Sequence, residues 1–207
     1  YKYLGKGSWK LNHDKWRLPS LSDQEIDSLF KRGKETLENL LLPIKEDYKC
    51  NVFRAGGWCI QPEEVILNSM RKHGFKIESS VAVGVSNPQT DRYFDFSNAP
   101  DLPQWQIDLK VTVQAEGAIL EVPILTVEMN GIKRSSFLAK RLQKKVPFKP
   151  NGCVGFAESA TKKSKLSKVA ELLKTQKSMF NFSDATTKEE MQWFVEQARI
   201  KYESNNE

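Results

Sequence analysis

This chain of 207 residues contains only two histidines and three cysteines, and it has no long apolar run. No stretch approaches the roughly 18 consecutive apolar residues of a membrane-spanning helix, so we expect no membrane span. Three cysteines cannot all pair within one chain, and none lies in a Cys-x-x-Cys pair. This usage favours reduced, buried thiols and a cytoplasmic protein. The sequence also shows no recognisable metal-binding cluster, and its second half has no histidine.

Positive charge is concentrated in one part of the chain. Between Gly131 and Lys177 there are 13 Lys and Arg residues against 2 Asp and Glu, whereas the rest holds 19 basic and 24 acidic residues. Such a region, 131–177, resembles a basic insertion that either meets an anionic partner or forms a solvated face. Because aromatic residues are not interleaved with the basic ones, we favour the solvated face. A nucleic-acid or anionic-lipid patch is the last of three interpretations.

The apolar pattern predicts a mixed α/β protein in which residues 1–207 form one domain. Ser22-Asp23-Gln24-Glu25 is a capping box, and it predicts a helix over residues 23–42. Residues 50–53 are typical of a short strand, 62–74 of a second helix and 75–83 of the next strand. Strand, helix and strand with tight connections predict parallel strands joined by a right-handed crossover.

The rest of the chain begins with an irregular segment over 86–105, and long loops on rigid scaffolds often carry binding residues. After it we expect two neighbouring strands, two helices, a short strand and a last capped helix: 107–114, 118–127, 135–145, 166–173, 179–182 and 188 onward.

The most informative stretch is Phe53-Arg54-Ala55-Gly56-Gly57-Trp58. A strand ends there in an arginine, two glycines and an aromatic residue, and a helix begins soon after. In alternating α/β chains, catalytic residues lie where a strand ends and a loop begins. Glycines also let the backbone approach a ligand closely. The stretch therefore predicts a site, and the alternative is a structural arginine that caps strand carbonyls.

From this stretch onward the chain resembles polysaccharide deacetylases of the NodB-homology type, carbohydrate esterase family four, in the divergent branch found with bacterial surface-polysaccharide genes. Residues 53–58 resemble the family's Arg-containing motif. Residues 75–81 resemble its Gly-hydrophobic-x-x-Ser-Ser-Val strand, and Leu120-Glu121-Val122-Pro123 resembles its Glu-hydrophobic-Pro strand. The resemblance covers roughly residues 18–124. It implies a distorted, here incomplete, (β/α) barrel that hydrolyses N- or O-acetyl groups of a glycan with a divalent metal, often zinc.

The resemblance also implies roles for the residues of the main motif. Arg54 would orient the base carboxylate through charge-assisted hydrogen bonds. Backbone N–H groups near Gly57 and Trp58 would help to form an oxyanion hole, and the Trp58 indole would form a wall for the sugar. Gly56 and Gly57 would let the substrate approach. Trp58 as a core residue is the alternative interpretation.

Four further residues receive interpretations from the sequence. Asp101 and Trp105 would line the substrate cleft, where the family places a further Asp and Trp, although loop carboxylates are commonly just solvated. His13 is the candidate metal ligand, and it departs from the family's His-x-His motif because Leu11 occupies the first position. His73, close to the end of a helix, is interpreted as a structural residue that complements the helix dipole.

Other parts of the implied zinc site have no counterpart in this sequence. The family's first strand, which ends in two adjacent aspartates, is missing before Tyr1, and the late Leu-x-His motif is absent. Either the start of the chain is missing or the chain is a degenerate member. We therefore expect a metal-dependent deacetylase of an acetylated polysaccharide or oligosaccharide, or alternatively an inactive glycan-binding module with the same fold. Glu121 is interpreted as an outward polar residue of its strand.

Overall fold

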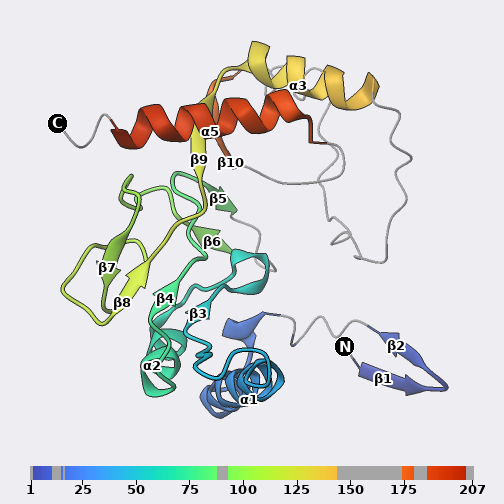
Figure 1. The fold of residues 1–207 in the computed structure, drawn as a ribbon, viewed down its shortest axis with the longest axis vertical. Helices are drawn as coiled ribbons and strands as arrows, with labels where there is room; N and C mark the ends of the chain where they lie inside the picture. Colours follow the sequence, from blue (N-terminus) through green and yellow to red (C-terminus); the bar gives the residue numbers. More distant parts are fainter. Residues whose placement is uncertain are drawn as a thin grey trace. The chain divides into compact units, whose positions relative to one another are not determined.

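A computed structural model of the chain describes residues 2–10, 15, 17–87, 93–143, 174–179 and 186–203 (Figure 1). The contacts divide the chain into two compact units, Tyr1–Ile124 and Leu125–Glu207. This division does not test whether the chain is the single domain that the sequence predicts, so the single domain stays a prediction. None of the described helices combines the length and the apolar character that crossing a membrane requires, as expected from the sequence.

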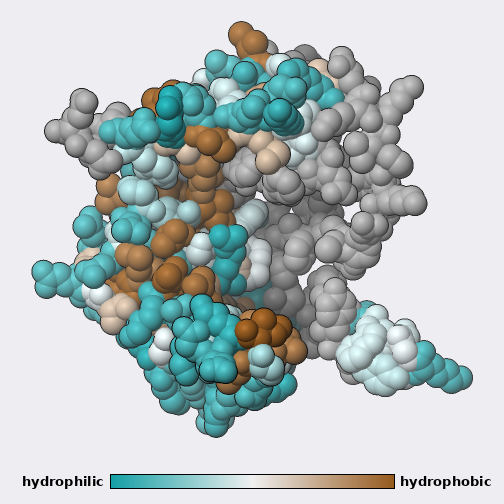
Figure 2. All heavy atoms as spheres, viewed as in Figure 1, coloured by the Kyte–Doolittle hydropathy of each residue, from teal (hydrophilic) through white to brown (hydrophobic). Residues whose placement is uncertain are grey.

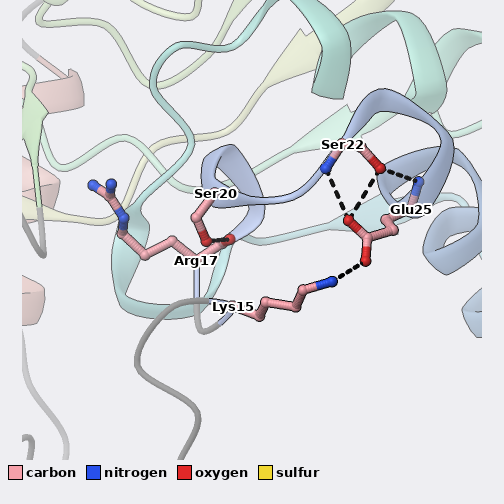
Figure 3. Close-up of polar contacts among 5 residues, drawn as sticks. All are labelled: Lys15, Arg17, Ser20, Ser22 and Glu25. Carbon is pink, nitrogen blue, oxygen red and sulfur yellow. Dashed lines mark hydrogen bonds and ion pairs between the residues drawn. The ribbon is translucent and has the colours of Figure 1, made fainter.

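The first unit opens with a β-hairpin and a capped helix. Strands β1 (Lys2–Gly5) and β2 (Ser8–Lys10) form the hairpin. Helix α1 spans Asp23–Leu41, and its predicted capping box is confirmed (Figure 3). Ser22 Oγ accepts the Glu25 N–H at 3.3 Å, and Glu25 Oε2 accepts the Ser22 N–H at 3.0 Å. A contact from Lys15 Nζ, together with these bonds, lowers the pKa of Glu25 to about 2.

Four short strands form the main sheet of this unit, in the order β3 (Val52–Phe53), β4 (Ile77–Glu78), β8 (Ile119–Glu121) and β7 (Trp105–Ile107). The first three run parallel and β7 runs antiparallel to β8. Helix α2 (Glu64–Lys72) connects β3 to β4, which confirms the predicted parallel strand–helix–strand unit. Beside this sheet, β5 (Ser86–Asn87) pairs with β6 (Phe94–Asp95). The described sheets are open, and the barrel stays a prediction.

The strand predicted over 107–114 is wrong, because β7 ends at Ile107 and the following residues form bends and turns. In this segment, side chains form hydrogen bonds with backbone N–H and C=O groups that would otherwise pair with a neighbouring strand. The Val111 N–H donates to Glu63 Oε1 at 3.2 Å, and the Val111 carbonyl accepts the Trp105 indole N–H at 3.0 Å. With both groups bonded in this way, Val111 cannot continue the pairing of β7.

Aromatic packing joins α1 to the sheet. The Phe30 ring lies 4.7 Å from that of Phe53 and 5.2 Å from that of Phe75, measured between centroids. The apolar face of α1 is only partly covered, since Leu37 and Leu40 are 42% and 66% exposed. Figure 2 shows such apolar residues among the hydrophilic ones that dominate this helix.

The end of α2 is tied to α1 by charge. His73 Nε2 lies 2.8 Å from Asp27 Oδ1, and Lys72 Nζ lies 2.9 Å from Asp27 Oδ2. These contacts lower the pKa of Asp27, Lys72 contributing most and His73 next. His73 thus joins two helices, in keeping with the structural role predicted for it.

The second unit contains an antiparallel strand pair and two described helices. Strand β9 (Thr126–Met129) pairs antiparallel with β10 (Gln176–Met179). Helix α3 spans Gly131–Gln143, and α5 spans Lys188–Glu203. The unit's core consists of residues from β9 and both helices: Val127, Met129, Phe137 and Phe194. The predicted cap of the last helix is confirmed by the Glu190 N–H, which donates to Thr187 Oγ1 at 3.1 Å. The helix predicted over 166–173 lies outside the described residues.

Candidate functional site

The candidate site lies at one edge of the main sheet. Strands β3, β4 and β8 are parallel neighbours, so the segments that follow them leave the sheet at the same edge (Figure 1). Arg54 follows β3, Ser79 and Ser80 follow β4, and Pro123 comes shortly after β8. In open α/β sheets, ligands bind outside the carboxyl ends of the strands. All three motifs of the predicted family therefore meet at the edge where binding is expected.

Arg54 is exposed, yet one side of its guanidinium is fixed. Its Nε donates to Ser79 O at 2.8 Å and its Nη2 donates to Ser79 Oγ at 2.9 Å. A guanidinium carries five N–H donors, and the others meet no acceptor among the residues that the structure describes. Arg54 also contributes to the lining of an apolar cavity of about 310 Å³ between α1 and β3. The side chain is thus held in place while part of its fork stays available to a ligand.

The turn after Arg54 has a conformation that few residues adopt. Gly57 and Trp58 both have a φ of 61°, in the left-handed region. This region is costly for a bulky side chain such as Trp, and strained positions of this kind cluster at functional sites. The Trp58 N–H donates to Ala55 O at 3.1 Å, whereas the Gly57 N–H meets no acceptor within the described ranges. Of the two predicted oxyanion donors, only that of Gly57 is therefore available.

Trp58 and Gly56 present different surfaces beside this turn. The Trp58 indole is half-buried and meets the Phe94 ring edge to face, with centroids 5.9 Å apart. A Cβ added to Gly56 would meet no heavy atom within 4 Å, so open space lies over this glycine. The predicted approach of a substrate to this backbone stays a prediction. The sugar-stacking role of Trp58 stays a prediction.

The other predicted site residues are scattered. Asp101 is exposed in the loop before β7. Trp105 is 2% exposed, and its indole N–H donates to Val111 O within the core. His13 lies outside the described residues. The predicted contacts of these residues with substrate or metal stay predictions.

Glu78 was not predicted from the sequence, and the interpretation of Glu121 as an outward residue is wrong. Both side chains are 0% exposed, and the two residues are register partners on the parallel strands β4 and β8. Parallel sheets are covered on both faces, so a polar residue within such a strand points into the protein rather than into water. A glutamate at the end of each of two parallel strands was the signal that would have found the pair.

The described residues do not supply the predicted zinc ligands. Within the described ranges, no group of three or more His, Cys, Asp and Glu side chains is arranged to hold a metal ion. The zinc site therefore stays a prediction.

Comparisons of the chain with protein-family models, with curated proteins and with solved structures found no match. The resemblance of residues 18–124 to polysaccharide deacetylases therefore stays a prediction from the sequence.

Proposed function

We propose that the chain is a protein of the polysaccharide deacetylase type that acts on N- or O-acetyl groups of a bacterial surface glycan. The observation that supports this proposal is the hydrogen bonding of the Arg54 guanidinium. Its guanidinium is fixed by Ser79 at the end of a parallel strand, but it keeps N–H donors that no described residue uses. A cation held in this way suits an anionic or strongly polarised oxygen.

The chemistry of deacetylation explains why such donors would be needed. Hydrolysis of an acetyl group passes through a tetrahedral intermediate whose oxygen carries negative charge. Arg54 and the Gly57 N–H both lie after β3, and they supply donors of the kind that stabilise such an oxygen or orient a base carboxylate. The open space over Gly56 would admit the acetyl group, and the half-buried Trp58 would offer an apolar edge to the sugar ring.

A glycan-binding module without hydrolysis is the second candidate, and the state of two carboxyl groups favours it. Glu78 and Glu121 end the strands next to Arg54, but both are fully buried. A carboxyl without solvent contact cannot take a proton from an attacking water. Within the described residues, the three strand ends therefore bring anion donors to the site but no exposed carboxylate base.

Acetate release from an N-acetylated chitooligosaccharide, with zinc supplied, tests the first candidate. We expect Arg54→Ala to reduce acetate release by about 100-fold or more, the cost of losing a donor that stabilises an oxyanion. Arg54→Lys should also fail, because a lysine cannot keep two bonds to Ser79 and still present a further fixed donor. Arg71→Ala is the matched control, since Arg71 lies in the same unit and pairs with Asp108 at 2.9 Å.

The outcomes separate the candidates. Loss of acetate release in the Arg54 variant with a melting temperature like that of the Arg71 variant supports the deacetylase. Glycan binding by the unaltered chain without acetate release, abolished by Arg54→Ala, supports the binding module. A chain that neither binds nor deacetylates the glycan refutes both, and an Arg54→Ala variant that loses fold and activity together makes Arg54 structural.

A further inference from the structure

Two carboxyl groups lie side by side inside the first unit. Glu78 on β4 and Glu121 on β8 are register partners, and neither side chain is exposed. Two carboxylates that are buried next to each other repel, and neither charge is solvated, so both cannot be ionised at once. The pair must therefore hold at least one proton at neutral pH.

The hydrogen bonds show which carboxyl holds it. Glu78 Oε2 accepts the Ser80 N–H at 2.8 Å, and Glu78 Oε1 is in short contact with Ser80 Oγ. Glu121 has fewer donors among the described residues, where Oε1 accepts only the Val81 N–H at 3.3 Å and the buried Oε2 has no hydrogen-bond partner. Donors stabilise the charged form of a carboxyl. Glu121, which has the poorer set of donors, is thus the carboxyl that holds the proton.

The surroundings of Glu121 agree with this assignment. Burial, and then the neighbouring Glu78 carboxyl, raise the pKa of Glu121 to about 11. The Arg54 guanidinium, from the segment after β3, acts in the opposite direction and more weakly. On β7 the register partner of Glu121 is Trp105, which does not titrate.

The segment held by these carboxyls also holds Arg54. Glu78 bonds Ser80 and Glu121 bonds Val81, while Ser79 accepts both bonds from the Arg54 guanidinium. Ser80 Oγ further accepts the Ala55 N–H at 2.8 Å, next to Arg54 in the chain. The residues from Ser79 to Val81 therefore connect the buried pair to the exposed arginine.

We propose that Glu78 and Glu121 share one proton and act as a positioning pair, which fixes residues 79–81 and, through them, the Arg54 guanidinium. The importance of this pair for catalysis rests on the proposed function, whereas the pairing itself does not. Removal of the shared proton would place a second charge beside Glu78. The segment would then leave its place, and Arg54 would lose its two acceptors on Ser79.

Glutamine at position 121 isolates the effect of the proton. Glu121→Gln keeps the shape of the side chain, cannot ionise, and carries amide N–H donors in place of the O–H of the acid. Glu63→Gln is the matched control, because Glu63 is also a buried glutamate of this unit, and it bonds the Val111 N–H at 3.2 Å away from the pair.

Carbon-detected nuclear magnetic resonance of the full chain between pH 6 and pH 12 tests the proposal. In the unaltered chain, the ¹³C signals should show one of the two carboxyls still protonated at pH 7. The Arg54 ¹³Cζ and Val81 ¹³Cα signals should shift together as that carboxyl titrates. In Glu121→Gln both signals should stay at their low-pH positions, and in Glu63→Gln they should follow the unaltered chain.

Two results would overturn the pairing. One is a carboxyl spectrum in which both glutamates are ionised at pH 7, which needs no variant and so does not depend on the folding of Glu121→Gln. The other is an Arg54 signal that titrates in Glu121→Gln as it does in the unaltered chain. Neither measurement uses acetate release, so a failure here leaves the proposed function untouched, and a failed acetate assay leaves the pairing untouched.

Discussion

The proton on Glu121 predicts how the free energy of unfolding depends on pH. An unfolded glutamate titrates with a pKa of 4.5, whereas the pKa of folded Glu121 is raised to about 11. Between these values the folded chain holds a proton that the unfolded chain has lost, so unfolding releases it. Rising pH therefore favours the unfolded chain. The contribution of this group is fully present below pH 4.5 and is lost progressively toward pH 11.

The size of the effect follows from one proton per unfolding event. The slope is about 1.4 kcal/mol for each pH unit. From pH 6 to pH 8, this single group should lower the free energy of unfolding by about 3 kcal/mol, a large part of the roughly 5–15 kcal/mol of an ordinary domain. In Glu121→Gln this group no longer titrates. The variant should therefore gain stability over the unaltered chain as the pH rises.

Urea unfolding followed by circular dichroism at pH 6, 7 and 8 measures this difference. The titration of all other groups is common to both proteins and cancels when one free energy is subtracted from the other. Glu63→Gln should give a difference that does not grow with pH. A constant difference between Glu121→Gln and the unaltered chain, or one that shrinks as the pH rises, would refute the reasoning.

Two further predictions concern packing and backbone conformation. Phe30 is 5% exposed and packs on Phe53 and Phe75, so Phe30→Ala should lower the free energy of unfolding by about 3–5 kcal/mol in urea. Gly57 has a φ of 61°, so Gly57→Ala should cost about 1–2 kcal/mol in the same assay. Gly56→Ala, which places its methyl in open space, should leave stability unchanged and weaken glycan binding in titration calorimetry.

The sequence predicted those parts of the fold whose signals are local. The capping box of α1 is complete within Ser22–Glu25, so its four residues specify the start of the helix. The parallel pairing of β3 and β4 follows from the short strand–helix–strand spacing. By contrast, the failed strand over 107–114 depended on Glu63 and Trp105, which bond Val111 from outside the segment. A pattern read along the chain does not contain those partners.

The candidate site likewise has one part that the sequence predicted and one part that it did not. Arg54 could be located from the sequence because a strand end and a glycine pair stand next to it. Glu121 could not be interpreted correctly, since alternation along one strand does not say which face is covered, nor that Glu78 is its neighbour across the sheet. Register joins residues 43 positions apart only once the sheet has formed.

The cost of burying two carboxyl groups bears on what the pair does. Leucines at these positions would fill similar space without desolvating a charge, and such replacements of buried polar pairs are often neutral or stabilising. They would, however, leave the buried N–H groups of Ser80 and Val81 without acceptors, at about 1–3 kcal/mol each. The role of the two glutamates is therefore to accept hydrogen bonds from the backbone that follows β4. Ser79, in the same segment, provides both acceptors for Arg54. The free-energy cost of burying the two carboxyl groups therefore goes with fixing the segment that orients the Arg54 guanidinium.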